Sequence, residues 1–200
     1  AILTTPRGLP LYFSPEDSRL EALHWLVSGA SGSGKSFFTG LVLKRLIDHG
    51  SRISVLFVDH NRSFRRFVRA AGGAYAEPET REQVVTGLNA LARFWDQPGT
   101  FSGIELSELS LHEKKETLQY VLIQVERYLR SRRTIHPLYV VLDECWNFLR
   151  AEPELVQRAF REYRKLNGAV IAVTQSLQDF LNDPTGQSIF QNAPVRILLR

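Results

Sequence analysis

A glycine-rich segment at residues 29–36 constrains the fold of this chain more than any other feature of its sequence. It reads Gly-Ala-Ser-Gly-Ser-Gly-Lys-Ser and matches the phosphate-binding pattern G-x-x-x-x-G-K-[ST] at every fixed position. The apolar run 24–28 before it predicts a strand, and apolar residues three or four apart after it predict a helix that ends near Gly50. A Gly/Ser-rich turn can match by chance, but the strand and helix on either side favour a true phosphate loop.

The loop predicts a nucleotide site in which each residue type has a physical role. Glycines let the backbone fold around an anion with its N–H groups pointing inward, and the helix N-terminus adds partial positive charge. We expect Lys35 to reach the β- and γ-phosphates and the Ser36 hydroxyl to ligate Mg²⁺, so the expected cofactors are ATP and Mg²⁺. The predicted nucleotide-binding residues are Gly29, Ala30, Ser31, Gly32, Ser33, Gly34, Lys35, Ser36 and Phe37.

The rest of the chain alternates short apolar runs with longer segments at helical spacing. This order is typical of an α/β fold with a mostly parallel central sheet flanked by helices. We find no internal repeat and no long linker, so we predict one domain over residues 1–200. The predicted strands are 24–28, 53–58, 104–106, 139–142, 169–174 and 195–199, and the predicted helices are 37–47, 64–71, 84–95, 118–129 and 154–166.

Composition excludes several classes of protein. With 44% hydrophobic and 23% charged residues, the chain is globular rather than disordered or collagen-like. Its single cysteine, Cys145, excludes an internal disulfide and a cysteine-based zinc site, and indicates a reducing compartment. No apolar run approaches the roughly 20 residues of a membrane-spanning helix. The chain has no methionine, even at position 1, and we expect it to be a piece of a longer polypeptide.

An acidic pair, Asp143-Glu144, ends the most strand-like run of the sequence, residues 139–142. This arrangement has the form of a Walker B site, in which Asp143 holds Mg²⁺ through water and Glu144 polarises the attacking water as general base. A kinase that transfers phosphate to a bound acceptor does not need the second carboxylate, so the pair favours hydrolysis. The alternative is an acidic turn that caps the segment after it.

A second apolar strand, 169–174, ends in the polar pair Thr174-Gln175. If this strand lies beside the Asp143 strand, the Gln175 amide is next to the γ-phosphate and can sense its presence. The alternative is that Gln175 caps the next helix.

The order of these motifs resembles the RecA-like, ring-forming ATPases of the HerA/FtsK group. The amino-acid sequence of the motifs is more similar to one branch, the VirB4/TraC family of conjugation and type IV secretion ATPases, and the similarity spans most of the chain. Its specific part is residues 164–192, which contain Arg-Lys-Leu-Asn-Gly, Ala-Val-Thr-Gln-Ser-Leu-Gln-Asp-Phe-Leu and Gly-Gln-Ser-Ile-Phe-Gln-Asn.

The resemblance implies a RecA-like P-loop domain that hydrolyses ATP to energise pilus assembly or substrate transfer. It also implies a hexameric or dimeric ATPase, cytoplasmic and docked on inner-membrane components of a bacterial secretion channel, with DNA contact possible. Two family features are missing from this sequence: a large N-terminal domain, and a long helical insertion after the second strand. At the place of the insertion, this sequence has only the short segment between Pro78 and Ile104.

Ring ATPases generally complete each site with an arginine from the neighbouring subunit. Arg158, Arg161 and Lys165 recur along one helix face with Arg164 alongside, and the resemblance puts Arg161 and Arg164 where the helix faces a neighbour. The alternative is a solvated face with local ion pairs. A second stripe is expected to be an exposed face rather than a DNA contact: Arg62, Arg65, Arg66 and Arg69.

Two other functions share these motifs. A DNA-translocating coupling ATPase or HerA/FtsK-like helicase has the same catalytic residues, and its DNA-stimulated, salt-sensitive turnover would distinguish it. A non-hydrolysing nucleotide-binding scaffold is the alternative of another class, and Glu144 argues against it because a scaffold needs no water-activating base.

Overall fold

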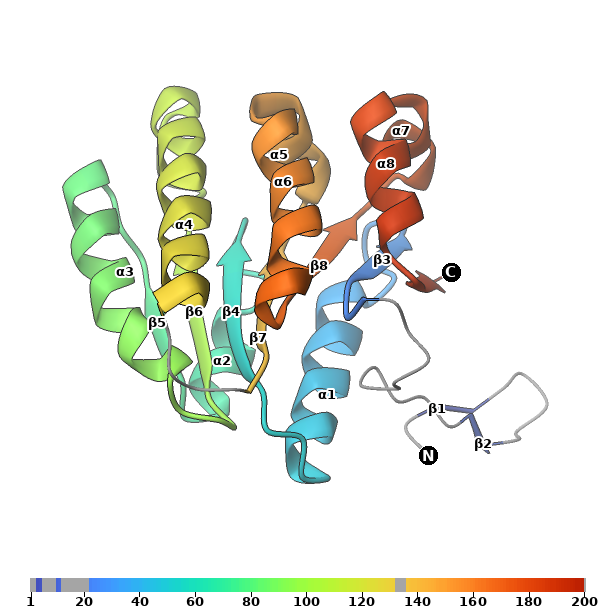
Figure 1. Ribbon diagram of the computed structural model, residues 1–200, viewed down its shortest axis with the longest axis horizontal. Helices are drawn as coiled ribbons and strands as arrows, with labels where there is room; N and C mark the ends of the chain where they lie inside the picture. Colours follow the sequence, from blue (N-terminus) through green and yellow to red (C-terminus); the bar gives the residue numbers. More distant parts are fainter. Residues whose placement is uncertain (1–2, 5–9, 12–21, 132–135, 200) are drawn as a thin grey trace.

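The structure is a computed structural model and describes residues 3–4, 10–11, 22–131 and 136–199. Seven strands form one parallel sheet in the order β5-β6-β4-β7-β8-β3-β9 (Figure 1). The strands are β3 Trp25–Gly29, β4 Ser54–Asp59, β5 Ala74–Ala76, β6 Phe101–Glu105, β7 Leu138–Leu142, β8 Gly168–Thr174 and β9 Val195–Leu199. Two short strands, β1 Leu3–Thr4 and β2 Pro10–Leu11, pair with each other.

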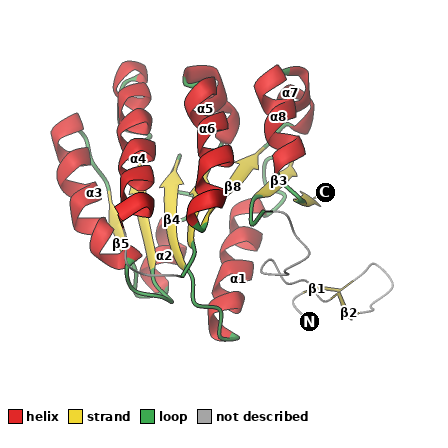
Figure 2. Ribbon diagram, viewed as in Figure 1, coloured by secondary structure: helices red, strands yellow, loops and turns green. Residues whose placement is uncertain are grey.

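Helices cover both faces of the sheet, with α1 and α2 on one face and the others on the opposite face (Figure 2). The helices are α1 Lys35–Asp48, α2 Arg65–Ala70, α3 Arg81–Trp95, α4 Leu111–Ser131, α5 Cys145–Ala151, α6 Pro153–Tyr163, α7 Leu177–Asn182 and α8 Pro184–Asn192, and a 3₁₀ turn, Arg164–Leu166, follows α6. The predicted α/β fold with a parallel sheet is therefore confirmed.

The core has two halves because successive residues of a strand point to opposite faces of the sheet. In β7, Val140 packs into the cluster beneath α3 to α8, whereas Tyr139 and Val141 pack into the cluster beneath α1 and α2. All five residues of β7 are buried, which explains why this strand is a continuous apolar run in the sequence.

Besides the two-residue strands β1 and β2, sequence periodicity did not predict four elements, and each is short. β5 has three residues, α5 has seven, and α7 and α8 have six and nine, with Pro184 starting the last of these helices. Such segments carry too few turns or alternations for a period to be recognised. The predicted strand at 104–106 is Phe101–Glu105, and the helix predicted over 154–166 ends at Tyr163.

Cys145 is fully buried, and burial raises the pKa of its thiol. Within the described part of the chain, no helix has the length and apolarity to cross a lipid bilayer.

Candidate nucleotide-binding and hydrolysis site

The carboxyl ends of the parallel strands bring the predicted groups to one edge of the sheet. The phosphate loop follows β3, the acidic pair follows β7, and Gln175 follows β8, which pairs with both of those strands. The strand that carries Gln175 therefore lies beside the Asp143 strand, which is the condition for a γ-phosphate sensor.

The phosphate loop has backbone geometry that requires glycine. Gly32 and Gly34 have φ angles of 77° and 85°, in the left-handed region that other residues rarely adopt. At Gly29, a Cβ atom would lie 2.7 Å from both the Leu199 carbonyl oxygen and Ser33 Oγ. No side chain caps the N-terminus of α1, so its first N–H groups are available to an anion.

Lys35 is buried at the start of α1 and is held by its own loop. Its Nζ donates hydrogen bonds to the carbonyl oxygens of Gly29 at 2.7 Å and Ala30 at 2.9 Å. Ser36 is half-buried beside it, whereas the Phe37 ring on the first turn of α1 is 76% exposed. Ser33 Oγ is buried with no hydrogen-bond partner among the described residues.

The acidic pair lies in a buried turn between β7 and α5. Asp143 and Glu144 are only 2% and 9% exposed, and Asp143 Oδ2 and Glu144 Oε2 are buried without a partner. Glu144 has a left-handed backbone with φ 50°, a strained state often found at functional sites. Glu144 is the N-cap residue of α5, but its side chain makes no capping hydrogen bond to that helix.

The predicted base and the predicted sensor are in contact. Gln175 Nε2 donates a hydrogen bond to Glu144 Oε1 at 2.5 Å. The other carboxylate oxygen, Oε2, is buried and has no hydrogen-bond partner among the described residues.

The electrostatics of this edge suit a cation. Burial, followed by the negative charge of Asp59, raises the pKa of Asp143 to about 8. Among the described residues, no cationic side chain forms an ion pair with Asp59, Asp143 or Glu144. Mg²⁺ takes oxygen ligands and commonly uses one or two carboxylates together with substrate phosphates. The free oxygen of Asp143 and the hydroxyl of Ser36 therefore fit Mg²⁺.

Asp59 is a polar residue of this edge to which the sequence analysis assigned no role. It ends β4, is fully buried, and accepts hydrogen bonds from the N–H groups of Ser63 at 3.0 Å and Phe64 at 2.8 Å. The available signal was a buried apolar strand that ends in aspartate, as β7 is followed by Asp143.

The candidate arginines lie far from this site in the same chain. Helix α6 leads through the 3₁₀ turn into the start of β8, so Arg161 and Arg164 are at the amino edge of the sheet, opposite the phosphate loop. The charge of Arg164 contributes to lowering the pKa of His24, which directly precedes β3. Both arginines are exposed, and neither has an ion pair within the described ranges.

The other two cations of that predicted stripe have partners. Arg158 forms an ion pair with Glu126 of α4 at 2.7 Å, and Lys165 forms one with Glu162 at 3.0 Å. The stripe thus divides into two engaged side chains and the two free arginines.

The arginine stripe at the start of α2 and just before it is exposed except for the half-buried Arg65, and it is not a bare cationic face. Arg62, Arg65 and Arg69 all lie against the carboxylate of Glu77, at 3.6, 3.1 and 2.6 Å.

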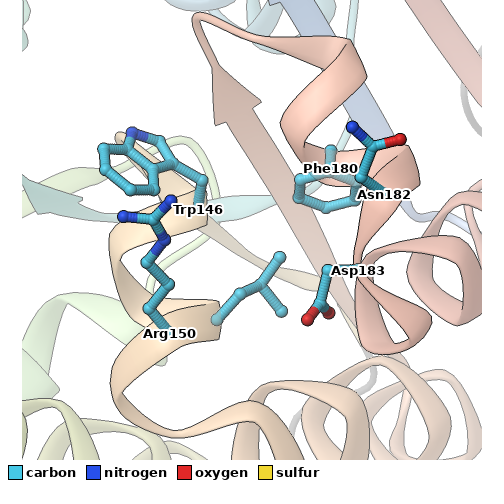
Figure 3. A pocket seen from close by; sticks show the side chains of 6 residues that line it. Trp146, Arg150, Phe180, Asn182 and Asp183 are labelled. Atoms are coloured by element: carbon cyan, nitrogen blue, oxygen red, sulfur yellow. The ribbon is translucent and has the colours of Figure 1, made fainter.

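A cavity of about 240 Å³ lies between α5 and the corner of α7 and α8 (Figure 3). Trp146 and Arg150 line it from α5, which begins directly after Glu144, and Phe180 lines it from α7, shortly after Gln175. The Arg150 guanidinium stacks 4.3 Å from the centre of the Trp146 ring. The helices that follow Glu144 and Gln175 in the chain therefore supply walls of this cavity.

A phosphate loop after β3, carboxylates after β7 and an amide after the intervening β8 define the fold class of the RecA-like P-loop ATPases. No family model matches the chain. Its sequence is 22% identical to type IV secretion system protein virB4 of Bartonella quintana and 21% identical to that of Bartonella henselae. Each match covers 98% of this chain but only 36% of the relative, and extends over 287 positions, so the relatives carry extra residues within the matched region.

Solved structures agree on the fold. VirB4 of Thermoanaerobacter pseudethanolicus superposes with a TM-score of 0.71 at 15% identity, over 98% of this chain and 83% of that one. The bacterial conjugative coupling protein TrwBdeltaN70 superposes with a TM-score of 0.56 at 13% identity, over 88% of this chain and 69% of that one. The genome packaging NTPase B204 of Sulfolobus turreted icosahedral virus 2, in complex with ATP-gammaS, superposes with a TM-score of 0.54 at 13% identity. The superposition covers 93% of this chain and 75% of that one. The resemblance to VirB4-type ATPases is therefore confirmed.

Proposed function

We propose that this chain is a single ATPase domain, the ATP-hydrolysing motor of a type IV secretion or conjugation machine. The observation that carries the proposal is the pair Glu144 and Gln175, a buried carboxylate with one free oxygen and an amide bonded to the other, beside a complete phosphate loop. The virB4 relatives are named as type IV secretion proteins, and this supports the choice of machine.

The phosphate loop binds ATP through its N–H groups and Lys35. To reach the β- and γ-phosphates, the Lys35 ammonium gives up its hydrogen bonds to the carbonyl oxygens of Gly29 and Ala30. Ser36 and Asp143 hold Mg²⁺, which when bound neutralises charge on the phosphates.

Hydrolysis needs a base and a means to recognise the γ-phosphate. Glu144 Oε2 takes the proton of the attacking water, because it is the oxygen that Gln175 does not occupy. Gln175 exchanges its bond to Glu144 Oε1 for one to the γ-phosphate, which couples the position of the Glu144 carboxylate to the presence of ATP.

Self-association completes this site. Arg161 and Arg164 are at the edge of the sheet opposite their own phosphate loop, so either can reach a γ-phosphate only in a neighbouring copy. We propose a ring, a hexamer or a dimer, in which one of these arginines stabilises the transition state across the interface. The proposed setting is the cytoplasmic face of the bacterial inner membrane, on components of the secretion channel.

The test is the ATPase rate per subunit measured against protein concentration, with and without DNA. We expect Mg²⁺-dependent hydrolysis that rises with concentration as subunits associate and responds little to DNA. Strong, salt-sensitive stimulation by DNA would assign the chain to the translocases instead. ATP binding with no hydrolysis at any concentration would assign it to the non-hydrolysing scaffolds.

A further inference from the structure

Three carboxylates form one row across the ends of adjacent strands. Glu105 of β6 is in register with Asp59 of β4, and the Asp143 N–H donates to the Val58 carbonyl oxygen at 3.0 Å, which puts Asp143 next to Asp59 on the other side. All three acidic residues are buried. Like charges opposite each other on neighbouring strands repel, so this row requires donors or cations between its members.

The Tyr75 phenol supplies a donor between the first two carboxylates. Its oxygen is 2.5 Å from Asp59 Oδ2 and 2.9 Å from Glu105 Oε2. Tyr75 is on β5, and β6 lies between β5 and β4, so the side chain crosses a whole strand to reach Asp59.

Gly103 makes this crossing possible. It is the register partner of Tyr75 on β6, and a Cβ atom there would lie 2.5 and 2.8 Å from two carbons of the Tyr75 ring. Any larger residue at position 103 would push the ring away from the sheet.

The two carboxylates that Tyr75 contacts also fix the turn after β4. Glu105 Oε2 accepts the Arg62 N–H at 2.8 Å, while Asp59 accepts the N–H groups of Ser63 and Phe64. Asn61 and Arg62 have left-handed backbones, which a free turn would avoid. Asp59 is therefore locked from three directions, with no freedom to rotate away from Asp143.

We propose that Tyr75 is a positioning residue for magnesium: through Asp59 it fixes the Asp143 carboxylate, whose Oδ2 is buried and unpartnered, in the orientation that receives the ion. This inference rests on the proposed ATPase function. Residues that orient a metal ligand without touching the metal commonly change metal affinity about 10-fold or more.

The test is binding of a fluorescent ATP analogue at increasing Mg²⁺ concentration. For Tyr75→Phe, which removes only the hydroxyl, we expect about 10-fold more Mg²⁺ at half-maximal binding and unchanged affinity without Mg²⁺. Gly103→Ala keeps the phenol but displaces its ring, and it should shift the Mg²⁺ dependence in the same direction. Tyr128→Phe is the matched control, because Tyr128 also donates to an aspartate, Asp96 at 2.8 Å, away from the site.

An unchanged Mg²⁺ dependence in folded Tyr75→Phe would overturn the inference while leaving the ATPase function intact. A Tyr75→Phe chain that does not fold would also overturn it, since the phenol would then serve the fold rather than the metal. If the wild-type chain binds no analogue at any Mg²⁺ concentration, the proposed function itself fails.

Discussion

Gln175 Nε2 donates a hydrogen bond to Glu144 Oε1 at 2.5 Å, joining the end of β8 to the turn that follows β7. These are the two positions at which a P-loop ATPase needs a γ-phosphate sensor and a base. Because the two side chains contact each other directly, a change at one alters the other without any relay.

Gln175→Ala tests the sensor. We expect it to bind ATP, to lose most of the difference in affinity between ATP and ADP, and to hydrolyse about 10-fold more slowly or worse, because the amide no longer reports the γ-phosphate to Glu144. Titrations with ATP and ADP and single-turnover hydrolysis measure these effects. Gln178→Ala, an exposed glutamine on α7, is the control. Normal discrimination between ATP and ADP in Gln175→Ala would remove the sensor role.

Glu144→Gln tests the base. The substitution keeps the size and polarity of the side chain but cannot accept a proton, so we expect normal ATP binding and a loss of hydrolysis of about 100-fold or more. Steady-state phosphate release measures it, with the exposed Glu154→Gln as control. Near-normal turnover would mean that another group activates the water.

Lys35→Ala tests the phosphate loop. We expect nucleotide binding to be lost while the fold is kept, because the ammonium is the strongest point charge in the loop. Equilibrium titration with ATP and circular dichroism measure the two properties. Lys44→Ala on the same helix is the control, since Lys44 is exposed and pairs with Asp48. Unchanged ATP affinity in Lys35→Ala would contradict the assignment.

A double substitution, Arg161→Ala with Arg164→Ala, tests completion of the site by a neighbour. It should bind ATP normally and hydrolyse it poorly, and mixing it with Lys35→Ala subunits should restore some activity, because intact loops then meet intact arginines. Arg66→Ala, an exposed arginine of α2, is the control. If the mixture stays inactive while both variants fold and assemble, these two arginines are not the completing groups.

The buried ring of His24 leads us to expect that the folded domain loses stability in acid. Its Nδ1 accepts the Val170 N–H at 2.9 Å and its Nε2 lies 2.6 Å from the Phe160 carbonyl oxygen, which is the pattern of a neutral ring. Burial lowers its pKa to about 4. Between about pH 6.5 and 4 the His24 ring binds a proton in the unfolded chain but not in the folded chain. The contribution of His24 to the free energy of unfolding is therefore complete above about pH 6.5, and it falls by about 3 kcal/mol as the pH drops to 4.

Urea unfolding at pH 7.5 and pH 5 measures this effect. His24→Gln should be less stable at pH 7.5 but should lose less stability on acidification than the wild type. His112→Gln, at an 81% exposed side chain, should keep the wild-type pH dependence. Equal losses for wild type and His24→Gln would assign the acid sensitivity to the carboxylates.

The groups that could be predicted from the sequence are those whose signal is local. Lys35, Glu144 and Gln175 each follow an apolar strand, and parallel strands must end at the same edge, so their proximity followed from the pattern. The Tyr75 contact could not be predicted in this way. It depends on the order β5-β6-β4, on a three-residue strand without periodicity, and on the absence of a side chain at Gly103. These features depend on which strands pair with each other, and the pairing cannot be read from a single sequence.

The position of Trp146 on the cavity between α5 and the corner of α7 and α8 gives the molecule an optical reporter of its own. The other two tryptophans, Trp25 and Trp95, are 0% and 1% exposed, so a dissolved collisional quencher such as acrylamide reaches only the indole of Trp146. The part of the tryptophan emission that the quencher removes therefore reports the exposure of Trp146 without any attached dye. Comparing acrylamide quenching before and after ATP is added shows whether the exposure of this one native side chain changes with the nucleotide.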